Sequence, residues 1–407
     1  MAIKGNLIIG QSGGPTAVIN SSLAGAFEAA KAAGVKKIYG MHYGIEGFLN
    51  ENIIDLKKEL KDSADVSLLR RTPSAFLGSC RYKLPKIEGN EEVYEKIFSI
   101  MEKYDIQYFL YNGGNDSMDT VKMLSDYAEQ HGKTQKFMGI PKTIDNDLPI
   151  TDHCPGFGSA AKYIATTLKE VIADAECYGP YRTSALIVEI MGRHAGWLTA
   201  AAALGGNKPD LIYLPEVSFD PKDFVKRVKE ITKKKSSVVI AVSEGIKLAN
   251  GEFVSAQGAD AKKDAFGHTQ LSGVGDYLAN MLTAEAGIKA RAIEFSTMQR
   301  CATHVVSKTD SDEAYNAGYM AAQKALEGCT GEMVVIKVES RAPYVTSYST
   351  FDIHEVANVE RTVPLEWITN DGTYVSDEFI EYAQPLIEGE IDAYYSKGVP
   401  QHLTLSE

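Results

Sequence analysis

The sequence predicts an α/β fold built from two doubly wound lobes, each with a mostly parallel sheet. Short apolar runs alternate with longer amphipathic segments almost throughout the 407 residues, which is the pattern of repeated βα units. Helix-end signals support this reading, because Gly34 closes the first helix candidate and Pro221 stands at the start of a later one. A chain of this length is expected to form two or three compact lobes.

The elements follow one another in a regular order along the chain. Strands are expected over residues 7–10, 37–39, 108–111, 137–140, 185–190, 211–214, 238–243 and 333–338. Helices are expected over residues 16–33, 117–130, 159–175, 222–235 and 313–327. In such folds ligands bind at the carboxyl ends of the strands, where helix N-termini present free N–H groups. The polar motifs of this chain fall at junctions of that kind.

The composition excludes several classes of partner. A hydrophobic content of 44% and a charged content of 24% are those of a soluble globular protein. The net charge of −12 argues against nucleic acid and against anionic membranes as partners. No leader pattern and no apolar stretch of membrane-spanning length is evident. The five cysteines are scattered, odd in number and without a CxxC pair, which favours reduced thiols and a cytoplasmic protein.

A loop after the fourth strand candidate concentrates reactive side chains. Its letters, IPKTIDND at 140–147, place Lys142, Thr143, Asp145 and Asp147 within six residues. A cation beside two carboxylates can hold a phosphate and a metal ion, and can take a proton from an attacking alcohol, as phosphoryl transfer requires. The alternative is a plain polar turn, since Asp, Asn and Pro are ordinary turn residues.

Two glycine pairs follow other strands and open helices, in the runs QSGGPT at 11–16 and NGGNDS at 112–117. Paired glycines let backbone N–H groups approach a phosphate, and the helix dipole favours its charge. In the second run we expect Ser117 or Asp116 to cap the following helix. Neither run has the spacing of GxGxxG or of the Walker lysine loop, so neither a dinucleotide site nor a P-loop is supported.

The order of these motifs resembles that of the phosphofructokinase family over roughly residues 6–340. The loop at 140–147 is similar to the family's PxTIDND signature, and the loop at 112–117 to its GGDxS loop. The run VEIMGR at 188–193 is similar to the family's VEVMGR, and SEG at 243–245 to its TEG. Arg291 and Arg300 keep the spacing of the family's R-x8-R segment. Five motifs in family order argue against coincidence.

The resemblance implies that pyrophosphate rather than ATP is the phosphoryl donor. ATP-using members carry glycine at the positions of Asp116 and Lys142. Asp116 would clash with and repel an α-phosphate while leaving pyrophosphate unhindered, and Lys142 can supply charge to pyrophosphate oxygens. The other implied donor-binding residues are Gly13, Gly14, Arg81, Gly114 and Ser117. For Arg81 a solvated loop arginine is the alternative.

The implied cofactor is Mg²⁺. Asn115 stands where the family usually has a metal-binding acid. Its amide oxygen can still ligate magnesium or hold one of its waters, but it brings no charge. Because of this departure, we expect Asp145 and Asp147 to contribute most of the metal binding.

The implied acceptor is fructose 6-phosphate. Met191, Gly192 and Arg193 would contact the sugar, and Glu244 would bind its hydroxyls. Both arginines of the R-x8-R segment would bind the 6-phosphate through bidentate guanidinium forks. The remaining candidates are Thr297, which replaces a common histidine of that segment, Gln299 beside it, and Arg182, which fits a surface arginine equally well. The apolar strand also carries Glu189, which needs a polar partner if it is buried.

The resemblance therefore implies a reversible, Mg-dependent transfer from pyrophosphate to the 1-hydroxyl of fructose 6-phosphate, giving fructose 1,6-bisphosphate and phosphate. Asp145 would be the general base, and Thr143 and Lys142 would stabilise the moving phosphoryl group. The active site is expected in the cleft between a donor lobe (1–157 with about 299–350) and an acceptor lobe (158–298). Residues 351–407 form an extension without a readable motif.

The family builds sites across subunit interfaces, so we expect a homodimer or homotetramer, with Arg291 reaching a neighbouring subunit's sugar phosphate. Two other functions stay open. An ATP-dependent enzyme of the same fold is disfavoured by Asp116 and Lys142, and a non-catalytic sugar-phosphate sensor is disfavoured by the presence of Asp145.

Overall fold

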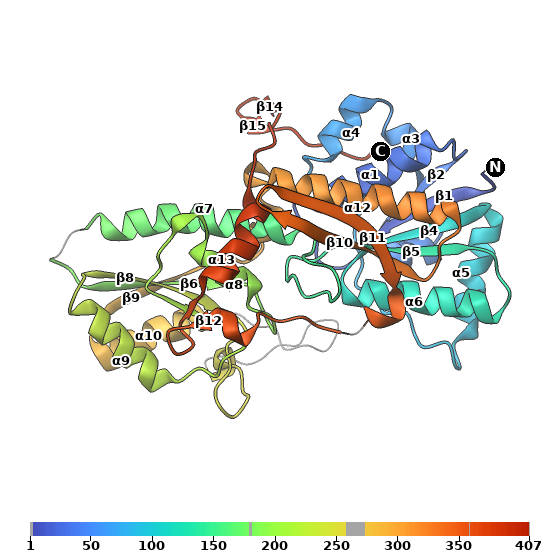
Figure 1. Cartoon of the computed structure of the whole chain (residues 1–407). Helices are drawn as coiled ribbons and strands as arrows, with labels where there is room; N and C mark the ends of the chain where they lie inside the picture. Colours follow the sequence, from blue (N-terminus) through green and yellow to red (C-terminus); the bar gives the residue numbers. More distant parts are fainter. Residues whose placement is uncertain (1–2, 179–180, 258–272, 358, 407) are drawn as a thin grey trace. The chain divides into compact units, whose positions relative to one another are not determined.

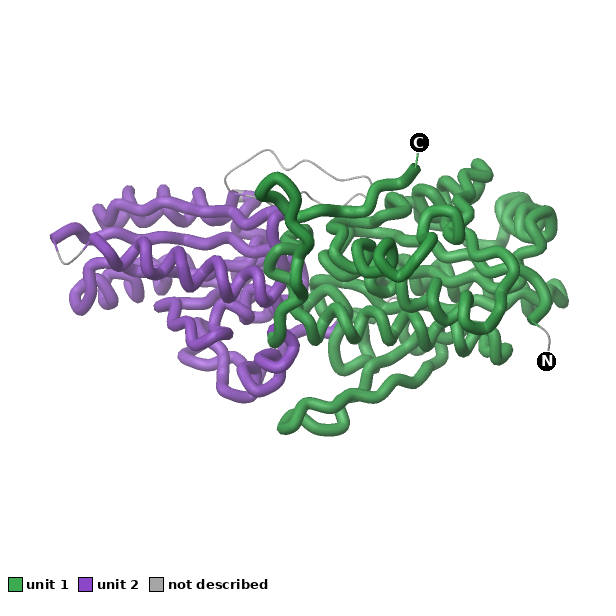
Figure 2. The backbone as a smooth tube through the Cα atoms, turned by 90° about the horizontal axis from the view of Figure 1, so that it is seen from above, with its two compact units in different colours: residues 1–159, 300–360, 388–407 green, residues 160–299, 361–387 purple. Residues whose placement is uncertain are grey.

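The computed structural model describes residues 3–178, 181–257, 273–357 and 359–406. Its contacts divide the chain into two compact units (Figure 2). Unit 1 comprises residues 1–159, 300–360 and 388–407, and unit 2 comprises residues 160–299 and 361–387. The C-terminal segment is shared between them, since 361–387 belong to unit 2 and the last residues return to unit 1. No helix among the described residues is long and apolar enough to cross a membrane.

Unit 1 is built on a seven-stranded sheet whose inner strands are parallel. The strand order is β11-β10-β5-β4-β1-β2-β3, and the two edge strands β3 and β11 run antiparallel to their neighbours. The strands are β1 (Asn6–Gln11), β2 (Ile38–Met41), β3 (Ile53–Asp55), β4 (Ile106–Gly113), β5 (Lys136–Pro141), β10 (Glu332–Arg341) and β11 (Tyr344–Asp352). The central β1 is buried on both faces, as a strand between two helical layers must be.

Helices cover both faces of this sheet (Figure 1). The side chains of β1 alternate, so that Leu7 and Ile9 pack on α1 (Ile19–Ala32) and α12 (Lys308–Glu327), while Ile8 shares the core of α5 (Glu91–Lys103) and α6 (Asn115–Gln130). Helices α1 and α12 approach closely at Gly25, which has no side chain. A Cβ at this position would lie only 1.9 Å from the Tyr315 carbonyl oxygen. The shorter elements of unit 1 are α2 (Gly44–Leu49), α3 (Leu56–Glu59), α4 (Ser63–Leu69), η3 (Thr303–Val305), η4 (Ile353–Glu355) and the hairpin β14 (Tyr395–Ser396) and β15 (Val399–Pro400).

Unit 2 has a four-stranded, fully parallel sheet in the order β7-β8-β6-β9. Its strands are β6 (Ser184–Ile190), β7 (Leu211–Tyr213), β8 (Ser237–Ser243) and β9 (Lys289–Glu294). Helices α9 (Pro221–Thr232) and α10 (Val274–Ala286) share its apolar core. Its other elements are α8 (Trp197–Ala200), η1 (Ala201–Gly206), η2 (Val254–Gln257), η5 (Leu365–Trp367), β12 (Ile368–Thr369), β13 (Tyr374–Val375), α13 (Asp377–Ala383) and η6 (Gln384–Ile387). The chain passes between the units within α7 (Phe157–Glu176) and within α11 (Met298–Cys301).

The α/β class with mostly parallel sheets is confirmed, as are the eight predicted strands and five predicted helices. The expected capping of α6 is wrong. The helix begins two residues earlier than predicted, with Gly114 at the N-cap and no side-chain cap, so Asp116 and Ser117 lie inside its first turn. Helix α12 also begins earlier, because Ser307 caps it by accepting from the Asp310 backbone N–H.

Candidate active site

Lys142 joins the first glycine loop to the loop at 140–147. Strands β1, β4 and β5 are parallel neighbours, so the loops that follow them meet at one edge of the unit 1 sheet. The buried Lys142 side chain donates from Nζ to the Gly14 carbonyl oxygen at 2.6 Å. Gly13 adopts a φ of +75°, and its N–H donates to the Cys80 carbonyl oxygen at 3.1 Å. A buried ammonium therefore stands beside the glycine turn.

Burial shapes the titration of Lys142 and Asp145. Desolvation lowers the pKa of Lys142 to about 8, although the nearby carboxylates of Asp145 and Asp147 oppose the shift. The Asp145 side chain reaches solvent, but the protein around it desolvates the carboxyl group, and together with Asp147 this raises the pKa of Asp145 to about 7. Desolvation also raises the pKa of Asp147. The site thus holds a carboxyl group and an ammonium that both titrate close to neutral pH.

Two buried oxygens beside these groups have no hydrogen-bond partner. They are Oδ1 of Asn115 and Oδ1 of Asp147, and the Asn115 Nδ2 donates to the other Asp147 oxygen at 3.5 Å. Buried polar atoms without partners are rare in folded proteins and mark places where an ion or ligand belongs. A carboxylate and an amide oxygen are ligands that Mg²⁺ accepts, with substrate phosphates and water completing the shell. The residues present therefore fit a magnesium ion.

The loop that carries Asp145 is fastened at several points along its length. The Thr143 N–H donates to the Pro155 carbonyl oxygen at 3.2 Å, closing the base of the loop. Within it, the buried Asn146 adopts a φ of +54° and accepts from the Cys154 N–H at 2.9 Å. The Asp310 carboxylate on α12 accepts from two backbone N–H groups just beyond the loop, each at 2.8 Å. These bonds fix the direction of the reactive side chains.

A buried ionic network continues this anchoring, and the sequence reasoning missed it. His153, which is 1% exposed, places Nε2 at 2.6 Å from a Glu313 oxygen and Nδ1 at 3.0 Å from Asp152. The Tyr344 hydroxyl donates to Glu313 at 2.9 Å, and Arg341 donates to Asp152 at 2.8 Å. The end of the loop is thereby tied to α12, β10 and β11.

The other donor candidates lie around this edge of unit 1. Asp116 stands in the first turn of α6 with its side chain 55% exposed, and Lys83 Nζ lies 3.8 Å from its carboxylate. Ser117 is buried in the same turn. Arg81 is exposed, and it lies close enough for its charge to help lower the pKa of Lys142.

Arg300, which the sequence assigned to the sugar phosphate, lies in unit 1 beside the donor candidates. Its guanidinium is close to Gly14, because a Cβ placed on that glycine would be 3.3 Å from NH1. Its charge contributes to the lowered pKa of Lys142 and partly opposes the rise in the pKa of Asp145. Arg300 and Arg291 belong to different units, and their joint binding of the sugar phosphate stays a prediction.

Unit 2 brings the main acceptor candidates together at the ends of β6 and β8. The Gly192 N–H donates to the Glu244 carboxylate at 3.3 Å. The two turns pack backbone against backbone, and a Cβ on Gly245 would lie 2.1 Å from the Arg193 carbonyl oxygen. Met191 and Arg193 flank Gly192 in the sequence, so the backbone of this run and Glu244 form one small cluster.

The remaining acceptor candidates lie elsewhere in unit 2. Arg291 is on the edge strand β9 in register with Leu186, four residues or about 13 Å before the end of β6. It is exposed and forms an ion pair with Asp174 at 3.4 Å. Arg182 is exposed just before β6, at the opposite end of the strand from the cluster. Thr297 is also exposed, whereas Gln299 is buried and donates to the Ser296 carbonyl oxygen at 3.0 Å.

Two glutamates, the buried Glu189 and the partly buried Glu216, brace the acceptor cluster. As expected, Glu189 has polar partners, because its carboxylate accepts from the N–H groups of Gly273 and Gly275 at 3.1 and 2.7 Å. Glu216 was missed, since a lone acid in a loop carries no sequence signal. Its Oε1 accepts from the Gly196 N–H at 2.7 Å and the Val363 N–H at 3.0 Å, which anchors the chain just after Arg193.

Comparison with known proteins places this architecture in a family. The phosphofructokinase family model matches residues 6–325. The pyrophosphate--fructose 6-phosphate 1-phosphotransferase of Xanthomonas campestris pv. campestris is 42% identical over 407 residues, covering 99% of this chain and 96% of that protein. The protein of the same name from Halomonas elongata is 41% identical, with 99% and 96% covered.

A solved structure agrees with these relatives. The crystal structure of a pyrophosphate-dependent phosphofructokinase from Nitrosospira multiformis superposes with a TM-score of 0.88 at 39% identity, covering 98% of this chain and 95% of that chain. Matches in sequence and in structure therefore both extend over nearly the whole chain. The chain belongs to the phosphofructokinase family.

Proposed function

We propose that this protein transfers a phosphoryl group reversibly from pyrophosphate to the 1-hydroxyl of fructose 6-phosphate, giving fructose 1,6-bisphosphate and phosphate. The observation that carries the proposal is the buried Lys142 ammonium beside the glycine turn, in the loop that also bears Asp145 and Asp147. The whole-length relatives whose names state this activity support the same substrates.

Magnesium is the proposed cofactor, held by Asp147 and Asn115 through the oxygens that lack partners. When bound, it would neutralise phosphate charge and hold the pyrophosphate oxygens in place. Lys142 and the Gly14 N–H would bind the same oxygens, and Arg300 and Arg81 would add positive charge. This local basic group is needed because the chain as a whole carries a net charge of −12.

Asp145 is the proposed general base. A carboxyl pKa near 7 is well above its ordinary value and suits a group that must accept a proton near neutral pH. Asp145 takes the proton of the sugar 1-hydroxyl as that oxygen attacks the nearer phosphorus of pyrophosphate. The bridging P–O bond breaks, and inorganic phosphate leaves. Lys142 and Thr143 hold the oxygens of the moving group, and in the reverse direction Asp145 returns its proton.

The acceptor would be held by the cluster of Met191, Gly192, Arg193 and Glu244. Arg291 lies on an exposed edge strand and not in this cluster. We propose that Arg291, together with Arg182, binds the sugar phosphate in a neighbouring subunit's site, so that the working form is a homodimer or homotetramer. Thr297 and Gln299 are proposed to line the same phosphate site. No disulfide links the five cysteines, which suits the cytoplasm as the compartment.

Asp116 is proposed to select the donor. It projects from the first turn of α6 with its carboxylate 55% exposed, where it adds negative charge next to the bound diphosphate. ATP would bring its α-phosphate next to Asp116, whereas pyrophosphate has no third phosphate to be repelled. Lys83 Nζ lies 3.8 Å from the Asp116 carboxylate.

The test is a donor comparison with purified protein. Fructose 6-phosphate and magnesium are supplied with either pyrophosphate or ATP, and fructose 1,6-bisphosphate is measured. We expect product with pyrophosphate, at least about a hundredfold more efficiently than with ATP. An Asp145→Asn preparation made in parallel excludes contaminating kinases. Equal efficiency with ATP would contradict the proposed donor, and no product from either donor would contradict the proposed reaction.

A further inference from the structure

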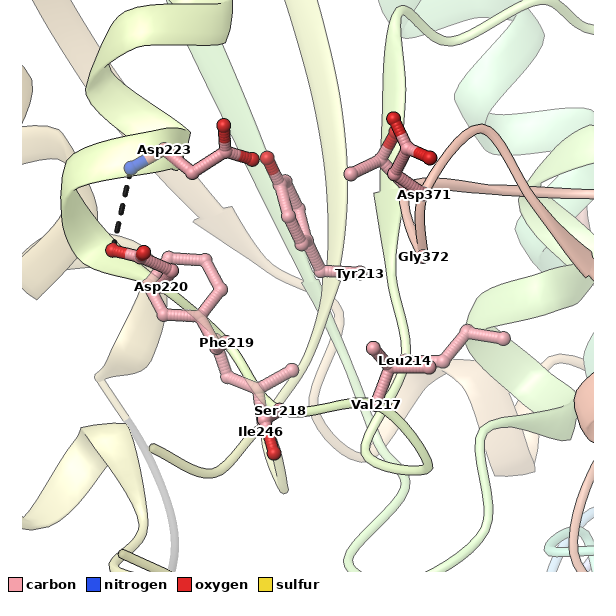
Figure 3. A pocket seen from close by; sticks show the side chains of 11 residues that line it. Tyr213, Leu214, Val217, Ser218, Phe219, Asp220, Asp223, Ile246, Asp371 and Gly372 are labelled. Atoms are coloured by element: carbon pink, nitrogen blue, oxygen red, sulfur yellow. Dashed lines mark hydrogen bonds between the residues drawn. The ribbon is translucent and has the colours of Figure 1, made fainter. Parts of the chain in front are cut away.

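Unit 2 contains a cavity beyond the carboxyl end of β7, which Ile246, two residues after Glu244, also lines. Its volume is about 260 Å³, and it lies between the loop that follows β7, the start of α9 and the turn at 371–373 (Figure 3). Because one water occupies about 30 Å³ of liquid, this volume suits a molecule of metabolite size. None of the residues proposed above to bind pyrophosphate or fructose 6-phosphate lines it.

The cavity has one buried polar group without a partner, the hydroxyl of Tyr213. This residue is 7% exposed, and its hydroxyl makes no hydrogen bond. Figure 3 shows its ring running between Asp223 on one side and Asp371 on the other, with the hydroxyl at the level of both side chains. Desolvation raises the pKa of Tyr213, so the group stays a neutral hydroxyl. An unpaired buried hydroxyl costs stability, and a ligand in the cavity would relieve that cost.

The charge around the cavity is negative. Asp220, Asp223 and Asp371 line it, and no Lys, Arg or His does. Arg227 does not line the cavity, but it forms an ion pair with Asp223 and lies 3.5 Å from the Asp371 carboxylate. One guanidinium cannot balance three carboxylates, so the cavity favours a cation and disfavours phosphates. The described residues offer no group of three His, Cys, Asp or Glu side chains placed to hold a metal ion.

We propose that this cavity binds a small organic ammonium compound. The ammonium would lie against Asp223 and Asp371 and donate to the Tyr213 hydroxyl. Its carbon chain would contact the ring of Phe219, whose centroid is 5.1 Å from that of Tyr213. Aromatic faces beside a carboxylate suit organic cations, which they attract through the ring quadrupole. The proposal depends on unit 2 alone, and it does not require the proposed phosphoryl transfer to be correct.

The test is calorimetric titration of the full chain with 1,4-diaminobutane, and with 1,4-butanediol as its uncharged counterpart. We expect saturable binding of the diamine, with a Kd of about 1 mM or below, and none of the diol. Asp223→Asn should weaken diamine binding about tenfold or more, because it removes the negative charge that attracts the ammonium and keeps an acceptor oxygen. Tyr213→Phe should weaken it about tenfold, because it removes the hydroxyl to which the ammonium donates.

The matched control is Glu230→Gln, which removes a carboxylate from α9 outside the cavity and should leave the diamine Kd unchanged. Circular dichroism confirms that each variant is folded. Tyr213→Phe keeps the ring and its packing, so it reports on the hydroxyl even if Asp223→Asn unfolds. The proposal is overturned if the diamine does not bind below about 10 mM, if the diol binds equally, or if Glu230→Gln weakens binding as much as the cavity variants do.

Discussion

The buried His153 network gives a prediction about stability and pH. Burial disfavours the charged imidazolium, but Glu313 and Asp152 outweigh it and raise the pKa of His153 to about 9, from an ordinary value of 6.5. A group whose pKa is higher in the folded protein binds protons more tightly there. Its contribution to stability is therefore complete below about pH 6.5 and is lost as the pH rises through 9. A shift of this size corresponds to about 3 kcal/mol.

The assay is urea unfolding of the wild type and of His153→Gln at pH 6 and pH 10. Glutamine can still donate a hydrogen bond to Glu313, but it cannot carry charge. We expect the variant to be less stable than the wild type at pH 6 and the difference to shrink by about 3 kcal/mol at pH 10. Taking the difference between the two proteins cancels the titration of other groups. A gap that stays constant across this range would show that His153 is not protonated in the folded protein.

Three further predictions concern the proposed reaction. Asp145→Asn should lower kcat by about 10²–10⁴ without unfolding the protein, and a loss below tenfold at unchanged KM would exclude this base. Gly14→Ala places a Cβ 3.3 Å from Arg300 NH1 and should raise KM for pyrophosphate severalfold while KM for the sugar phosphate stays constant. The opposite pattern would indicate that Arg300 binds the sugar phosphate. Gly245→Ala places a Cβ 2.1 Å from the Arg193 carbonyl oxygen and should raise KM for fructose 6-phosphate at least about tenfold in steady-state kinetics. An unchanged KM would show that this turn does not contribute to sugar binding.

Much of the fold could be predicted because inner strands of a parallel sheet are continuous apolar runs. Strands β1 and β8 are buried along their whole length, and β4 is buried except at Gln107. Such strands stand out in a sequence. The edge strand β9 was missed because most of its side chains, including Arg291, are at least partly exposed, which leaves no apolar run to detect.

Long-range pairings could not be predicted. His153 and Glu313 are 160 residues apart, and either residue alone looks like an ordinary polar side chain. The closeness of Arg300 to Gly14 could not be predicted either, because the two residues lie far apart along the chain. A motif in the sequence shows which residues are close along the chain but does not show which distant segments meet in the fold.

The C-terminal segment packs within unit 2 through aromatic side chains. Trp367 lies 6.1 Å from Trp197 between ring centroids, and Tyr382 lies 5.3 Å from the same indole. The Trp197 Nε1 donates to the Arg361 carbonyl oxygen at 3.1 Å. Such aromatic contacts depend on shape and burial, which a single sequence does not reveal.

The measurement that tests the central claim most directly is the ratio of ATP to pyrophosphate efficiency, kcat/KM for each donor, in Asp116→Gly relative to the wild type. Asp116→Asn is the matched control, because it removes the charge and keeps the volume. The account predicts that the ratio rises at least about tenfold in Asp116→Gly, with loss of pyrophosphate use and a smaller rise in Asp116→Asn. An unchanged ratio in a folded protein would contradict the claim that this turn of α6 selects the donor.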